Sequence, residues 1–164
     1  MMLPFALIIA VPYFVKNGLS DLETIATNML YLVLFVVLML VELVVHEGIH
    51  GLVWGLLNKE GFSAIEFGVV REYLTPYCYC GAPLLRWQYI IGSAMPTIIL
   101  GFIQGGIAVA SGNILIFALS MVMMIGGGGD FLIIILLLLY RKKKRNLVLM
   151  DHPTQVGSFL FEKD

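Results

Sequence analysis

The sequence reads Glu42-Leu43-Val44-Val45-His46-Glu47-Gly48-Ile49-His50-Gly51 in the middle of its second apolar segment. Residues four apart share one face of a helix, so His46 and His50 can direct their imidazoles at one point. Neutral imidazoles bind Zn²⁺ at about 2.0–2.1 Å, and the neighbouring carboxylate of Glu47 can take a proton from water held between them. Burying three ionisable groups in an apolar span costs free energy, so such groups indicate a functional site. The stretch therefore predicts a Zn²⁺ site on a membrane helix, with Glu47 as the catalytic base.

The composition indicates a membrane protein. Hydrophobic residues make up 60% of the 164 residues and the mean hydropathy is +0.95, whereas soluble domains contain about 45–50% apolar residues. We therefore expect residues 1–164 to form a single membrane domain. The net charge of −1 gives no reason to expect a nucleic-acid partner. Cys78 and Cys80 are too close in sequence for an ordinary disulfide and are interpreted as reduced packing residues.

The apolar segments predict an α-helical polytopic membrane protein with about four transmembrane helices. The first segment is short for a hydrocarbon core of about 30 Å, so it crosses marginally or enters part-way. Pro96 is expected to kink the third span, and the run Gly126–Gly129 predicts local unwinding or close helix approach in the fourth. The expected spans cover about residues 3–16, 29–57, 86–109 and 114–140.

Residues 58–85 lack a helical period and predict a short β-hairpin-like excursion from the membrane. β-branched and aromatic residues alternate with other residues here, which indicates two short strands. Pro76 cannot donate to a ladder, so its strand should lie at an edge. Such an edge can bind an extended peptide by strand addition, and the candidate residues for that contact are Phe67, Val69 and Thr75.

Asp130 carries the only charged side chain between Arg86 and Arg141 and is the candidate third metal ligand. The basic run 141–145 predicts a cytoplasmic C-terminal tail, residues 141–164. Counting the spans back from the tail places residues 58–85 on the cytoplasmic side as well. His50 then lies about 12 Å, and Asp130 about 16 Å, from the cytoplasmic ends of their spans. The two residues should therefore meet at similar depth, towards the cytoplasmic face of the cell membrane.

Two further residues are candidates for supporting the metal site. Glu42 precedes His46 by one helical turn. It is either an acceptor for an imidazole N–H or a protonated carboxyl bonded to a neighbouring helix. His152 is interpreted as a surface-loop residue of the tail. The alternative is a tail that folds back over the site and brings His152 to it.

With these residues identified, the chain resembles the intramembrane zinc metalloproteases of the site-2 protease type. It is more closely similar to a small family of integral-membrane zincin peptidases, over roughly residues 29–153. The resemblance implies that His46, His50 and Asp130 hold zinc and that Glu47 activates water. The chain departs from the site-2 pattern because Asp130 lies in Gly-Gly-Asp-Phe, without the Asn-Pro element or the following glycine. Met95-Pro96 likewise lacks the asparagine that follows the proline in the third-span motif of those proteases.

The leading hypothesis is a metalloprotease that cuts a membrane-embedded or juxtamembrane peptide, with the bilayer and a membrane protein as partners. Intramembrane Glu, His and Asp residues also mark proton and metal pathways, so a transport protein is an alternative. A second alternative is a zinc-bound assembly protein without catalytic activity. The sequence leaves the substrate, the oligomeric state and the choice between these functions open.

Overall fold

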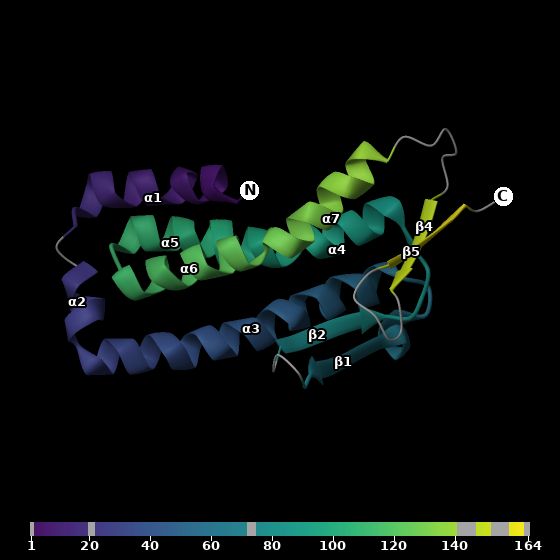
Figure 1. Ribbon diagram of the computed structural model, residues 1–164, viewed down its shortest axis with the longest axis horizontal. Helices are drawn as coiled ribbons and strands as arrows, with labels where there is room; N and C mark the ends of the chain where they lie inside the picture. Colours follow the sequence, from purple (N-terminus) through teal and green to yellow (C-terminus); the bar gives the residue numbers. More distant parts are fainter. Residues whose placement is uncertain (1, 20–21, 72–74, 141–146, 152–157, 163–164) are drawn as a thin grey trace. The chain divides into compact units, whose positions relative to one another are not determined.

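The computed structural model describes residues 2–19, 22–71, 75–140, 147–151 and 158–162, which form helices and two small sheets (Figure 1). Contacts divide the chain into two compact units. The first combines Met1–Val44 with Pro96–Gly129, and the second combines Val45–Met95 with Asp130–Asp164. The single membrane domain expected from the composition remains a prediction.

Among the described residues, two helices are long and apolar enough to cross a membrane. One is α3, with 29 residues, and the other is the continuous 26-residue helical stretch Arg86–Ser111. The pair α6 and α7 adds a third span if this broken helix crosses once, whereas α1 is shorter. Two or three spans are therefore supported, and the expected number of four is not confirmed. The helices are α1 (Leu3–Asn17), α2 (Leu22–Thr27), α3 (Met29–Leu57), α4 (Arg86–Pro96), α5 (Gln104–Ser111), α6 (Ile114–Gly126) and α7 (Gly128–Leu139).

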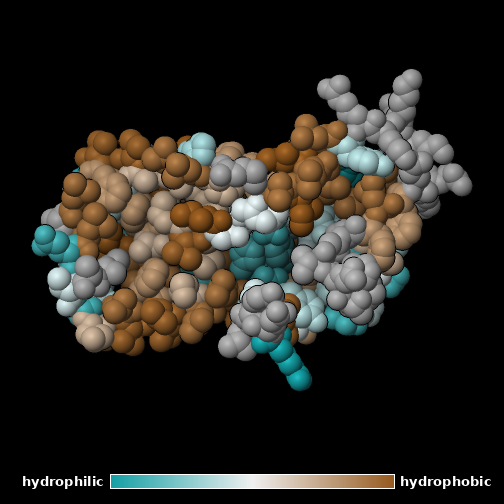
Figure 2. Space-filling view, in the orientation of Figure 1, coloured by the Kyte–Doolittle hydropathy of each residue, from teal (hydrophilic) through white to brown (hydrophobic). Residues whose placement is uncertain are grey.

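In the first unit, the short helix α1 packs against α5 and α6 (Figure 1). Lys16 donates hydrogen bonds to the carbonyl groups of Val109 and Ala110, at 2.9 and 2.8 Å. These carbonyls lie in the last turn of α5, where no intrahelical donor is available. Tyr13 also donates to the carbonyl of Gly112, over 3.0 Å. These hydrogen bonds therefore join the C-terminal end of α1 to the C-terminal end of α5. Hydrophobic side chains dominate the surface of this unit in Figure 2.

The helix interruptions expected from proline and glycine both occur. Pro96 ends α4 and is followed by a π-helical segment, η2 (Thr97–Ile103), which accommodates the hydrogen bond that proline cannot donate. Gly127 forms the turn between α6 and α7. A Cβ atom at Gly127 would lie 2.2 Å from the hydroxyl oxygen of Thr97, so this position needs glycine for close approach.

The predicted excursion contains an antiparallel hairpin of β1 (Ile65–Val70) and β2 (Thr75–Cys80). The backbone amide of Cys80 donates to the Asp151 carboxylate over 3.1 Å and therefore points away from β1. Because backbone direction alternates along a strand, Cys78 and Pro76 face the same outer edge of β2. Pro76 has no N–H to pair, which suits this edge position.

One face of the segment around the hairpin packs on the C-terminal half of α3. A Cβ atom at Gly51 would lie 2.4 Å from the ring of Phe67, and one at Gly55 would lie 2.4 Å from the ring of Phe62. Phe62 belongs to the 3-10 turn η1 (Gly61–Ala64) that precedes β1. Gly51 and Gly55 of α3 therefore leave room for aromatic side chains from this segment.

Two strands of the tail join a sheet that was not expected from the sequence. Strands β3 (Leu84–Leu85), β4 (Leu147–Asp151) and β5 (Ser158–Glu162) form an antiparallel sheet in that order. Residues 147–151 and 158–162 are therefore strands where only a tail was expected. Leu84 and Leu149 pair across the sheet and are both buried, and they share a core with residues of α3, α4 and α7. This core comprises Trp54, Ala64, Cys80, Ala82, Leu84, Tyr89, Leu137 and Leu149.

Candidate metal centre

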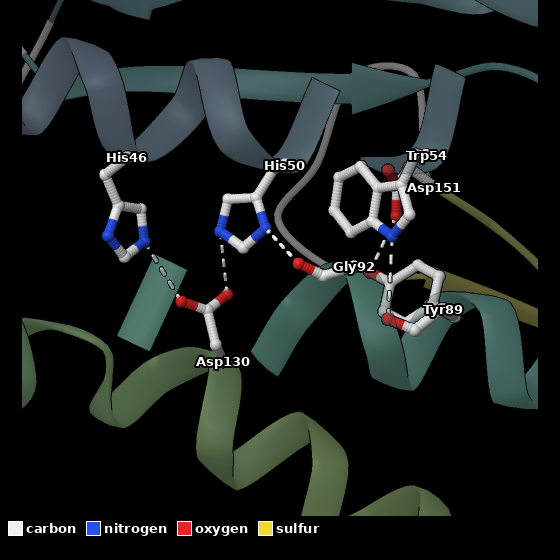
Figure 3. A network of polar contacts seen from close by, with 7 residues as sticks. All are labelled: His46, His50, Trp54, Tyr89, Gly92, Asp130 and Asp151. Carbon is white, nitrogen blue, oxygen red and sulfur yellow. Dashed lines mark hydrogen bonds and ion pairs between the residues drawn. The ribbon is translucent and has the colours of Figure 1, made fainter. Parts of the chain in front are cut away.

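Three side chains from two helices of the second unit converge on one point (Figure 3). His46 and His50 project from successive turns of α3, and Asp130 projects from the first turn of α7. Nε2 of His46 lies 3.2 Å from Oδ2 of Asp130, and Nε2 of His50 lies 3.4 Å from Oδ1. One ligand atom from each residue lies within 4.8 Å of the other two. The residues are thus positioned to bind a metal ion.

The two histidines approach different oxygens of one carboxylate. His46 lies 3.2 Å from Oδ2 and His50 lies 3.4 Å from Oδ1, so both imidazoles converge on Asp130. Two histidines and one carboxylate are also a donor set of catalytic zinc sites, where they leave the fourth position for water or substrate.

The tautomer of His50 suits a metal ligand. Its Nδ1 atom lies 2.9 Å from the carbonyl oxygen of Gly92. A carbonyl can only accept, so Nδ1 carries the hydrogen, and Nε2 of the neutral ring carries a lone pair. That lone pair faces the Asp130 carboxylate, which in its ionised form is also an acceptor. Two acceptors at this distance repel unless a positive charge lies between them, which either a proton on Nε2 or a bound metal ion provides.

Aromatic rings enclose His50 on the side facing the protein core. His50 is only 4% exposed, and its ring stacks on Trp54 with centroids 5.0 Å apart and planes inclined by 17°. Trp54 in turn packs against Tyr89 at 5.2 Å. A flat, buried stack of this kind restricts the rotation of the imidazole. The ring is consequently oriented before a metal binds.

Glu47 lies beside the same site. Its carboxylate interacts electrostatically with His46, His50 and Asp130, and it accepts a hydrogen bond from the backbone amide of Cys78. The outer edge of β2 therefore borders the candidate base. This arrangement brings together Glu47 and the three candidate ligands named from the sequence.

The remaining candidates lie elsewhere or face other directions. Glu42 belongs to the first unit, where Gln104 of α5 donates to its Oε1 atom over 2.6 Å. This contact matches the alternative of a carboxyl bonded to a neighbouring helix. The other oxygen of Glu42 is buried without a partner among the described residues. His152 lies outside the described residues, so its expected place in a surface loop remains a prediction.

The residues proposed for a substrate-binding edge divide between the two strands. Phe67 pairs with Cys78 and Val69 pairs with Pro76. Their backbone groups therefore face the outer edge of β1, on the opposite side of the hairpin from the edge that borders Glu47. Thr75 pairs with Val70, and its backbone groups face β1.

The two cysteines behave as packing residues rather than ligands. Both are free, and the thiol of Cys80 donates to the carbonyl oxygen of Ala82 over 3.6 Å. Burial, together with the negative charges of Glu47 and Asp151, raises the pKa of the Cys78 thiol to about 12. Burial also raises the pKa of Cys80. Protonated thiols at neutral pH are poor metal ligands and poor nucleophiles.

Four residues around His50 were not identified from the sequence: Trp54, Tyr89, Gly92 and Asp151. Trp54 follows His50 by four residues on α3, so helical spacing could have identified it. Tyr89 and Gly92 lie on α4, and Asp151 lies on β4. No local pattern links these three residues to the motif, because their contacts depend on packing between distant segments.

Comparison with known proteins supports the same chemistry. A family model described as "Putative zincin peptidase" matches residues 37–146, which is more than half of the chain and includes all three metal-site residues and Glu47. Neither the curated proteins nor the solved structures contain a match. Zincins are zinc peptidases, so the family supplies the identity of the metal for which His46, His50 and Asp130 are positioned. The chain belongs to the family described as "Putative zincin peptidase".

Proposed function

We propose that this protein is an intramembrane zinc metalloendopeptidase of the His-Glu-x-x-His type. It hydrolyses peptide bonds of membrane-embedded or juxtamembrane substrates. The observation that carries the proposal is the convergence of His46, His50 and Asp130 beside Glu47. The helix that supplies both histidines and Glu47 is long and apolar enough to span a membrane. Family membership supports peptidase chemistry, and the apolar helices support a membrane setting.

Each residue of the site has its own role in the proposed reaction. His46, His50 and Asp130 would hold a zinc ion, which would supply Lewis-acid chemistry to the scissile carbonyl and the attacking water. Glu47 accepts the proton of the attacking water and delivers it to the leaving amine. Asp130 contributes a negative charge that partly neutralises the cation. His50 is held by Gly92 and Trp54, so its coordinating nitrogen needs little reorganisation.

A substrate must present an extended backbone, since a helical segment keeps its carbonyls hydrogen-bonded within the helix. The outer edge of β2 lies next to Glu47 through the amide of Cys78. We place the cleaved segment along this edge rather than along the outer edge of β1. The hairpin would then hold the peptide through the outward-facing carbonyl groups of β2, because the amides of Cys78 and Cys80 already donate to Glu47 and Asp151 and Pro76 has no N–H.

The proposed setting is the cell membrane, with several spans and the C-terminus in the cytoplasm. The basic run 141–145 follows directly after the apolar α7, and such a run favours the cytoplasmic side. The hairpin follows the C-terminal end of α3 after a short connection. We therefore propose that the active site opens towards the cytoplasmic face.

Glu47→Gln tests the mechanism. The amide keeps the shape of the carboxylate, so zinc and fold should survive, but it cannot act as a general base. Loss of a positioned base lowers rates by typically ~10²–10⁴-fold. Wild type, Glu47→Gln and the exposed-carboxylate control Glu66→Gln are reconstituted with membrane proteins of the host, and new peptide termini are identified by mass spectrometry.

The expected result is cleavage by wild type and Glu66→Gln, with little or none by Glu47→Gln at equal zinc content. Equal cleavage by wild type and Glu47→Gln would overturn the mechanism. Zinc flux into vesicles without new termini would instead support the transport alternative. Zinc binding with neither flux nor cleavage in the wild type would support the non-catalytic alternative.

A further inference from the structure

We propose that Asp151, on the C-terminal strand β4, is a positioning residue for the zinc ligand His50. It acts through Tyr89 and Trp54, and the proposal deepens the proposed function because it rests on the same metal site. The sheet formed by β3, β4 and β5 thereby helps to hold His50 in position. All four residues belong to the second unit and appear together in Figure 3.

The Asp151 carboxylate joins two elements that flank the site. Its Oδ1 atom accepts a hydrogen bond from the hydroxyl of Tyr89 over 2.8 Å, and its Oδ2 atom accepts one from the amide of Cys80 over 3.1 Å. One donor belongs to α4 and the other to β2. Hydrogen bonds to an ionised acceptor are about twice as strong as neutral ones. The carboxylate therefore fixes the position of Tyr89 relative to the hairpin.

Tyr89 passes this constraint to His50 by packing. The rings of Tyr89 and Trp54 lie 5.2 Å apart, and the indole N–H of Trp54 points to the carbonyl of Tyr89 at 3.5 Å. Trp54 stacks on His50 at 5.0 Å. Tyr89 and Trp54 are 4% and 5% exposed, so neither ring can move without disturbing its neighbours.

The same helix carries the second constraint on His50. Gly92 follows Tyr89 by three residues, so both lie on one side of α4. The carbonyl of Gly92 accepts the Nδ1–H of His50, which leaves Nε2 available to the metal. Asp151 therefore anchors the helix that supplies both the packing contact and the hydrogen bond. Displacing α4 would weaken both contacts at once.

The predicted consequence is a loss of zinc affinity. Removal of outer partners of metal-binding histidines typically lowers metal affinity about 10–100-fold. Asp151 acts through two intermediaries, so we expect Asp151→Ala to lower zinc affinity by about tenfold, at the lower end of that range. Tyr89→Phe deletes only the hydroxyl and keeps the ring against Trp54, so its effect should be smaller but in the same direction.

The test measures zinc affinity on full-length protein in detergent, by competition with a chromogenic chelator. The visible spectrum of bound Co²⁺ reports ligand geometry, and thermal unfolding reports stability. The variants are Asp151→Ala, Asp151→Asn and Tyr89→Phe. Matched controls are Glu66→Gln, which neutralises an exposed carboxylate, and Tyr77→Phe, which removes the hydroxyl of an exposed tyrosine.

Weaker zinc binding and an altered Co²⁺ spectrum in the Asp151 and Tyr89 variants, but not in the controls, would support the inference. If Asp151→Ala does not fold, Tyr89→Phe provides the same comparison with minimal change. Wild-type affinity and spectrum in every variant, even with reduced stability, would overturn the inference and leave Asp151 a structural role only. Failure of the wild type to bind zinc would instead overturn the proposed metal site itself.

Discussion

His50 donates its Nδ1–H to the backbone carbonyl of Gly92, 2.9 Å away, and so links the motif helix α3 to α4. The link requires a glycine at position 92. A Cβ atom there would lie 1.9 Å from the indole nitrogen of Trp54, which is stacked on His50. Because Gly92 has no side chain, His50 can contact both the carbonyl of Gly92 and the ring of Trp54, and these two contacts orient its imidazole.

Gly92→Ala should consequently impair the metal site. The added methyl must push Trp54 or α4 away, so we expect a loss of zinc affinity of about 10–100-fold, together with reduced thermal stability. The matched control is Gly48→Ala, on the motif helix itself, where a Cβ atom meets nothing within 4 Å. Chelator competition on both variants checks this, and equal affinities would contradict the proposed role of Gly92.

His46→Ala should lose bound zinc, because only two protein ligands would remain. Metal-to-protein ratios measured by elemental analysis should fall from about one zinc per chain towards zero. His152→Ala is the comparison, because His152 is predicted to lie in a surface loop. It should retain zinc. Loss of zinc in the His152 variant would show that the tail supplies a ligand.

Cys78 should react slowly with iodoacetamide, because burial raises its pKa to about 12 and thiolate is the reactive form. The rate, measured in a Cys80→Ser background, should keep rising with pH well above 9.0, the ordinary pKa of a thiol, instead of levelling near it. Glu47→Gln should speed the reaction, since it removes a neighbouring negative charge. A plateau near pH 9 would contradict this account of the hairpin.

The same pKa predicts how stability changes in alkaline solution. A thiol ionises more readily in the unfolded chain than in the fold, so its contribution to stability is complete below about pH 9. That contribution is lost as the pH rises from about 9 towards 12. Thermal unfolding across this range should show a smaller loss for Cys78→Ala than for wild type, and parallel curves would contradict the shift.

The proposed topology places the hairpin segment and the basic run on one side of the membrane. Single cysteines at Ser63 and Lys143, in a background lacking Cys78 and Cys80, should be labelled by an impermeant maleimide from the same face. Labelling from opposite faces would mean that the number of crossings between these positions is odd.

The chemistry of the site could largely be predicted from residues close in sequence. His46, Glu47 and His50 lie within five consecutive positions of a helix, so helical geometry alone directs the two imidazoles to one side. Asp130 was predicted because a single charge in a long apolar stretch needs a partner. The hairpin was predicted from the loss of helical period, although the edge that borders Glu47 was not.

Only the tertiary structure decided what supports His50 and how the tail is folded. Trp54, Tyr89, Gly92 and Asp151 act together through contacts between segments up to 71 residues apart, as between Cys80 and Asp151. No repeating pattern encodes such contacts, and β4 became recognisable only once Leu149 was seen in the shared core. The sequence by itself determined apolar helices and the ligands on one helical face, because those follow from periodicity within a few turns. Packing of distant segments determined ring orientation, tautomer and the strand beside the base, because these depend on which side chains fill the same space.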